Sequence, residues 1–152
     1  MIRLLHTADL HLDAPLRSLA LTDEALRGQV RAAARDALRR VVDHALATDA
    51  AALLLAGDVF DREVQSLDAV AFFAAQAARL AERDVPVFMI RGNHDFENRA
   101  AQRLPLPGNV HVFGPEGGVR LIERGGQAIA VHGVSYDRRG APASLLERFG
   151  PP

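Results

Sequence analysis

Short apolar runs alternate with longer segments of helical periodicity along the first ninety residues of the chain. Three runs, at Ile2–Leu5, Ala51–Ala56 and Val87–Ile90, have the length and composition of β-strands. The second and third contain no polar residue, which is typical of strands in a parallel sheet that is covered on both faces. The pattern therefore predicts three strands, of which at least two are fully buried.

Two segments between these runs repeat apolar residues at steps of three and four, the spacing of one helical face. The first runs from an N-cap at Thr22 to about Ala47, and the second from an N-cap at Ser66 to about Glu82. The predicted inward positions are Leu26, Val30, Ala34, Leu38, Val41 and Ala45 in the first helix and Leu67, Val70, Ala74, Ala77 and Ala81 in the second. This alternation predicts a βαβαβ unit with parallel strands and right-handed crossovers.

The pattern changes after residue 97. The later elements predicted are one or two helical turns at Asn98–Arg103, a strand at Val110–Phe113, strands at Val119–Glu123 and Ala128–His132 around the turn Arg124–Gln127, and the start of a helix at Ala143–Phe149. The expected fold class is α/β, in which the βαβαβ unit is followed by a β-hairpin within one domain over residues 1–152.

Composition narrows the possible classes of protein but does not identify a function. The chain has 152 residues and a net charge of -1, which argues neither for nor against nucleic acid. All 18 basic residues are arginine, which we attribute to genomic base composition before phosphate chemistry. Absence of cysteine excludes disulfides and thiolate metal sites. The sequence shows no membrane-spanning run and no signal peptide, so a cytoplasmic protein is expected.

Polar side chains of ligand type follow each predicted strand. Asp9 and His11 follow the first, Asp58 and Asp61 follow the second, and Asn93 follows the third. Each has a simpler reading, because loop carboxylates cap helices and Gly-Asn is a common turn. Three such strand ends in one sheet are harder to obtain by accident. Carboxylate, imidazole and amide oxygen suit Mn²⁺, Mg²⁺, Fe²⁺ or Zn²⁺, and a carboxylate can bridge two such ions.

The segments Asp9-Leu10-His11, Gly57-Asp58-Val59-Phe60-Asp61 and Gly92-Asn93-His94-Asp95 resemble the first three motifs of the calcineurin-like metallophosphoesterases. The longer stretches LLHTADLHLDAPL, LLLAGDVFDR and IRGNHD are most similar to bacterial DNA repair exonucleases of the SbcD type. The resemblance covers roughly the first hundred residues and implies the N-terminal portion of that fold.

The resemblance also implies roles for six residues. Two metal ions are expected, preferably Mn²⁺, and they would be held by Asp9, His11, Asp58 and Asn93, with Asp58 bridging. His94 would stabilise the transition state or protonate the leaving oxygen, and Asp95 would orient the His94 ring. In the full-length protein the resemblance implies DNA as substrate, an SMC-like ATPase subunit as partner and no membrane.

The chain departs from the family pattern in its second half. It contains no Gly-His-x-His motif, and His132 is interpreted as a structural residue or as one that contacts the ligands, and not as a ligand itself. A capping domain and an ATPase-binding tail are also missing, so we expect a truncated domain with weak metal binding and little activity. Truncation should bare apolar surface and strand edges, which favours self-association, for example as a homodimer.

Two other functions remain open. One is a calcineurin-like phosphoesterase that acts on nucleotides or small phosphodiesters. The other is a non-catalytic fragment of the same fold that binds a partner. The intact His94 argues mildly against the second alternative, and the absent ligands argue for it.

Overall fold

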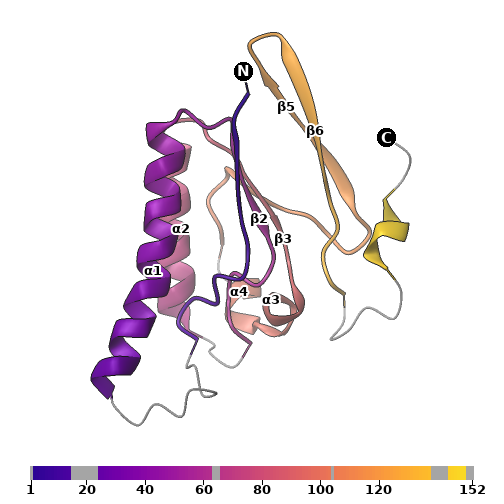
Figure 1. Cartoon of the computed structure of the whole chain (residues 1–152). Helices are drawn as coiled ribbons and strands as arrows, with labels where there is room; N and C mark the ends of the chain where they lie inside the picture. Colours follow the sequence, from indigo (N-terminus) through magenta and orange to yellow (C-terminus); the bar gives the residue numbers. More distant parts are fainter. Residues whose placement is uncertain (1, 15–23, 63–65, 104, 138–143, 150–152) are drawn as a thin grey trace.

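The structure, a computed structural model, describes residues 2–14, 24–62, 66–103, 105–137 and 144–149 (Figure 1). Four parallel strands form one sheet in the order β1-β2-β3-β4. Their bounds are Leu4–Thr7 for β1, Ala52–Ala56 for β2, Val87–Ile90 for β3 and Val110–Val112 for β4. The prediction of parallel strands joined by helices is confirmed.

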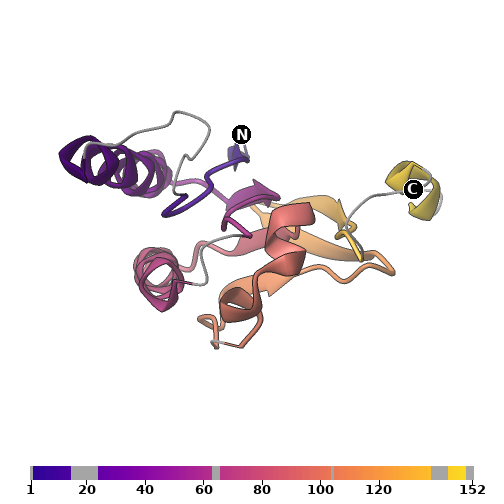
Figure 2. The ribbon, with the colours of Figure 1, turned by 90° about the horizontal axis from the view of Figure 1, so that it is seen from below.

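Helices α1 (Glu24–Ala47) and α2 (Leu67–Ala81) lie side by side and cover one face of the sheet (Figures 1 and 2). Leu53 and Leu55 of β2 pack against this helical layer. The alternate residues Ala52 and Leu54 belong to a second cluster, which lies between the sheet and the hairpin. Both faces of β2 are therefore covered, which is the physical reason for its uninterrupted apolar run.

The hairpin consists of β5 (Gly118–Arg124) and β6 (Gln127–Gly133). Its turn residues Gly125 and Gly126 have φ angles of 58° and 74°, the left-handed conformation required at both central positions of a type I′ turn. The predicted hairpin is confirmed, with each strand longer than expected. Ile122 carries the contact of the hairpin with Phe88 and Phe113 on the second face of the sheet.

The remaining elements are short. Helices α3 (Asn93–Glu97) and α4 (Arg99–Arg103) follow β3. The helix start expected near the end of the chain is a short 3-10 helix, η2 (Leu145–Arg148). No helix in the described ranges is both long and apolar enough to cross a membrane.

Some predicted positions differ from the structure. β1 begins and ends two residues later than expected, because the backbone pairing with β2, and not side-chain apolarity, defines it. Leu26 and Leu67 are 40% and 60% exposed, and Ala81 is also exposed, so the predicted inward stripes fail in the terminal turns of both helices. Ser66 caps α2 as predicted, whereas the expected cap Thr22 lies outside the described residues.

Candidate metal centre

The loops after β1 and β2 are joined by backbone hydrogen bonds that continue the sheet beyond its strands. The amides of Asp9, His11 and Leu12 donate to the carbonyls of Gly57, Asp58 and Val59 over 3.1, 3.0 and 2.9 Å. Asp9, His11 and Asp58 have φ angles of 54°, 42° and 52°. Asp and His are among the residues that adopt this left-handed conformation most readily, which suits their use here.

The first group of candidate ligands comes from these two loops. Asp9, His11 and Asp58 each offer one ligand atom within 4.8 Å of the others. The distance from His11 Nε2 to Asp9 Oδ1 is 3.9 Å, and the Asp9 side chain is 75% exposed, so the group is open to solvent. Carboxylate and imidazole donors at these separations suit a divalent cation.

A second group shares His11 with the first and lies beside it. It consists of His11, Asp61 and His94, whose ligand atoms also lie within 4.8 Å of one another. Asp61 Oδ2 is 3.6 Å from His11 Nδ1 and 3.5 Å from His94 Nδ1. The two imidazole rings meet edge to face, with centroids 4.7 Å apart. His94 Nδ1 is buried without a hydrogen-bond partner, so a cation or a small movement of Asp61 is needed to satisfy it.

The loop after β3 packs directly against Asp58 and is hydrogen-bonded to it. The His94 amide donates to Asp58 Oδ1 over 3.0 Å. A Cβ atom at Gly92 would lie 2.1 Å from the same oxygen and 2.8 Å from the Asp58 backbone nitrogen. Only glycine leaves room for the carboxylate at this point, and the close approach of β2 and β3 places it there.

Asp95 has a different task from the one expected for it. Its side chain is buried, with Oδ1 accepting from the Phe60 amide over 2.8 Å and Oδ2 from the Gly92 amide over 3.0 Å. Burial raises the pKa of Asp95, and these hydrogen bonds oppose the rise. The carboxylate that faces the His94 ring is that of Asp61. The reason is geometric, because successive residues of α3 project about 100° apart.

The loop after β1 is also fixed to both long helices through Asp13. Arg35 Nε and Nη2 donate to Asp13 Oδ1 and Oδ2 over 2.8 and 2.5 Å, and the Ser66 hydroxyl donates to Oδ2 over 3.3 Å. The Asp13 hydrogen bond raises the pKa of Arg35, which therefore stays charged.

The other predicted site residues divide as follows. Asn93 begins α3 at the same edge, directly before His94, and its role as a ligand stays a prediction. His132 lies exposed in β6 with its ring 6.3 Å from that of Phe149, and neither ligand group formed by the described residues includes it. Asp61 was present in the second motif, and its position three residues after Asp58 was the signal for its place here.

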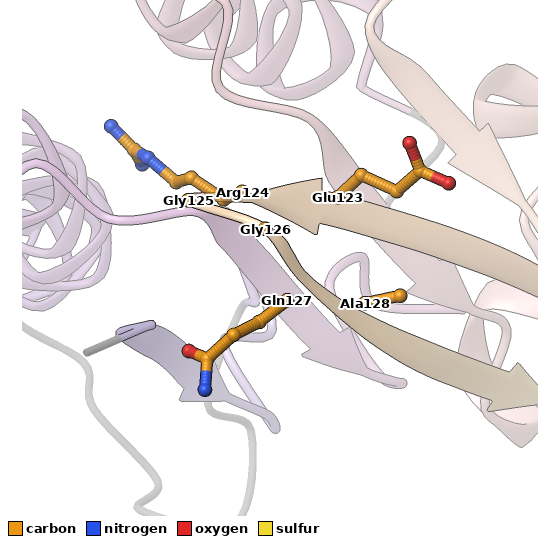
Figure 3. Close-up of a pocket in the computed structure, with 6 residues that line it drawn as sticks. All are labelled: Glu123, Arg124, Gly125, Gly126, Gln127 and Ala128. Atoms are coloured by element: carbon orange, nitrogen blue, oxygen red, sulfur yellow. The ribbon is translucent and has the colours of Figure 1, made fainter.

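A hollow at the hairpin turn lies at the opposite end of the sheet (Figure 3). It is lined by residues 123–128, and its Arg124 donates to the carbonyl and carboxylate of Asp49, in the connection that leads into β2. The candidate ligands follow the other ends of the strands. This hollow therefore belongs to the turn and not to the metal centre.

Two comparisons with known proteins agree with this geometry. The chain matches the family of calcineurin-like phosphoesterases over residues 2–144. It is also 31% identical over 148 residues to a Bacillus subtilis (strain 168) protein whose name is "Uncharacterized metallophosphoesterase YhaO". That alignment covers 95% of this chain and 36% of the relative, so the chain spans little more than a third of the relative's length. Since the family match extends over nearly the whole chain and its strand ends carry the ligand groups, the chain belongs to the calcineurin-like phosphoesterase family.

Proposed function

We propose that the protein hydrolyses phosphodiesters with divalent cations bound where β1, β2 and β3 end. The observation that carries this proposal is the meeting of the three strand-end loops in two ligand groups that share His11. Asp9, His11 and Asp58 form the proposed ligand group, in which the Asp58 carboxylate can bridge two cations as in two-metal phosphoester hydrolysis, and the second group sets the His94 imidazole and the Asp61 carboxylate beside it.

The chemistry of the donors fits hard to borderline cations such as Mn²⁺. Asp9, His11 and Asp58 would hold them, joined by Asn93, and thiolate-preferring ions are disfavoured because the chain has no cysteine. Bound cations would activate a water molecule and offset charge on the phosphoryl oxygens. The Asp58 carboxylate is already oriented to bind a cation, because its Oδ1 accepts a hydrogen bond from the His94 amide.

His94 is the proposed proton donor to the leaving oxygen. Its Nδ1 faces Asp61 at 3.5 Å, so its Nε2, on the other side of the ring, remains for a substrate oxygen. The side chain is 24% exposed, which leaves a path to substrate. Asp61 would hold the ring in this orientation, the part first expected of Asp95.

The substrate proposed is DNA, with the protein acting as a repair exonuclease in the cytoplasm. This choice is supported by the similarity of the LLHTADLHLDAPL, LLLAGDVFDR and IRGNHD segments to SbcD-type enzymes, which also suggests Mn²⁺, a longer natural chain and an SMC-like ATPase partner. Exposed Val119 and Leu121 on the outer face of the hairpin support self-association.

The test compares Asp58→Asn with the matched control Asp84→Asn. Both aspartates have left-handed φ angles, 52° and 53°, and Asp84 is exposed and follows α2, away from the ligand groups. Mn²⁺ binding is measured by calorimetry, and hydrolysis with bis(p-nitrophenyl) phosphate and linear DNA, on this chain and on a longer natural chain that contains it. We expect Asp58→Asn to lose Mn²⁺ binding and about 100-fold or more in turnover, and Asp84→Asn to retain both.

Three results would decide between the candidates. Unchanged Mn²⁺-dependent turnover in Asp58→Asn would overturn the proposed site. Rapid hydrolysis of small phosphodiesters without cleavage of DNA would favour the nucleotide alternative. Absence of any turnover in wild type, with an intact fold, would favour the non-catalytic alternative.

A further inference from the structure

We propose that Asn98 is a positioning residue for this site, in that its side-chain amide fixes the loop that carries Asp61. The inference rests on the proposed function where it concerns turnover. Asn98 lies between α3 and α4, just after the third motif, and its side chain reaches back to the loop after β2. Through that loop it sets where the Asp61 carboxylate stands between His11 and His94.

The Asn98 side chain is fully buried and forms hydrogen bonds through both its nitrogen and its oxygen. It is 1% exposed, its Nδ2 donates to the Asp61 carbonyl over 2.7 Å, and its Oδ1 accepts from the Ala101 amide over 3.0 Å. Its own amide donates to the Asp95 carbonyl over 3.1 Å, at the end of α3. One residue therefore ends α3, caps α4 and holds the carbonyl of Asp61.

Asp95 supplies a second attachment to the same loop, one residue earlier. Its Oδ1 accepts from the Phe60 amide over 2.8 Å, and it is as buried as Asn98. The backbone of Phe60 and Asp61 is thus held from one side by two buried side chains of the α3 segment. Buried hydrogen bonds of this kind are costly to break, so they restrain the position of the loop.

Helix capping alone does not require asparagine at this position. An N-cap needs an acceptor for the amide of the third helical residue, which Asp, Ser or Thr supplies equally well. The Asn98 amide adds a donor on a separate atom, Nδ2, which binds the Asp61 carbonyl and which an aspartate lacks. Capping of α4 alone therefore does not account for asparagine at this position.

The substitution Asn98→Asp separates the capping of α4 from the hydrogen bond to the Asp61 carbonyl. The variant keeps an oxygen for the Ala101 amide, removes the donor to Asp61, and brings a carboxylate against the Asp61 carbonyl. Asn109→Asp is the matched control, since Asn109 Nδ2 also joins two segments, through the carbonyls of Ala77 and Val85 at 3.0 Å each. Asn109 precedes β4, at the end of the sheet remote from the ligand groups.

The experiment compares both variants with wild type by thermal unfolding, by the NMR signals of the His11 and His94 imidazoles, and by kcat and KM on bis(p-nitrophenyl) phosphate with saturating Mn²⁺. Both variants are expected to lower Tm. Only Asn98→Asp should shift the imidazole signals and lower kcat, by about tenfold with KM nearly unchanged. A merely structural role for Asn98 would lower Tm alone.

Unshifted imidazole signals in Asn98→Asp, or equal shifts in Asn109→Asp, would overturn the inference. The imidazole comparison needs no turnover. A wild-type protein that fails to hydrolyse the substrate would therefore contradict the proposed function and still leave the positioning role decided by NMR.

Discussion

Replacing Gly92 with alanine tests whether the site depends on the close approach of β2 and β3. The φ angle of Gly92 is -78°, which any residue adopts, so backbone strain does not contribute. The obstacle is contact, because the new Cβ would lie 2.1 Å from Asp58 Oδ1 and 2.7 Å from its Cγ. Relief of this overlap requires the carboxylate to move by about 1 Å or more.

The movement has two costs. The Asp58 carboxylate loses its 3.0 Å hydrogen bond from the His94 amide, and the packed loop must expand where the Asp58 backbone nitrogen also lies within 2.8 Å of the new atom. Overpacking costs about 1–3 kcal/mol, and a lost hydrogen bond to a charged group costs about 1.5–3 kcal/mol. Together these costs predict a loss of about 2.5–6 kcal/mol in the free energy of unfolding. We also expect a loss of at least about 100-fold in turnover, since misplacement by about 1 Å has that effect.

Gly28→Ala is the control for the substitution itself. Gly28 is exposed in α1 with nothing within 4 Å of a built Cβ, so alanine should stabilise the helix by up to about 1 kcal/mol. Urea unfolding gives the stability, and calorimetry with Mn²⁺ gives the affinity for the cation. If Gly92→Ala matched wild type in stability and in Mn²⁺ affinity, the reasoning about the crowded Asp58 carboxylate would be refuted.

Three further substitutions test other parts of the structure. Asp61→Asn should lower kcat by about 10–100-fold with saturating Mn²⁺, because His94 loses its facing carboxylate; unchanged kcat would contradict that pairing. Arg35→Met should destabilise by about 3 kcal/mol in urea unfolding, since it leaves the buried Asp13 carboxylate without its partner. Burial, and then the charge of Arg120, lower the pKa of His111, so its contribution to stability is complete above about pH 6.5 and is lost as pH falls. The urea midpoints at pH 7.5 and pH 5.5 should therefore differ less in His111→Phe than in wild type. An equal difference in the two proteins would contradict this role of His111.

The sequence was sufficient for the central strands and for the edge where the site lies. Ala51–Ala56 and Val87–Ile90 are apolar throughout because β2 and β3 are covered by helices on one face and contribute to the second cluster on the other. The carboxyl ends of parallel strands share one edge, so the residues after them had to lie near each other. β1, at the border of the sheet, was placed less well, because its apolar signal is weaker than its backbone pairing.

The separate roles of the carboxylates could not be predicted from the sequence. Whether Asp61 or Asp95 faces the His94 ring depends on where α3 begins and how it is rotated, which no local pattern specifies. The pairing of Arg35 with Asp13 was hidden for a similar reason. The two residues are 22 positions apart, and an arginine on a polar helix face reads as solvated until the loop beside it is known.

The hydrogen bonds that join Asp9, His11 and Leu12 to the loop after β2 make the candidate ligands part of the sheet's own ladder. β1 and β2 are separated in the chain by α1, so this ladder closes only when a long crossover has already folded. The amide hydrogens of the ligand loop should then exchange with solvent as slowly as those of β1 itself. We therefore expect the candidate metal centre to open only when β1 detaches, and a cation bound there would stabilise the whole α/β unit.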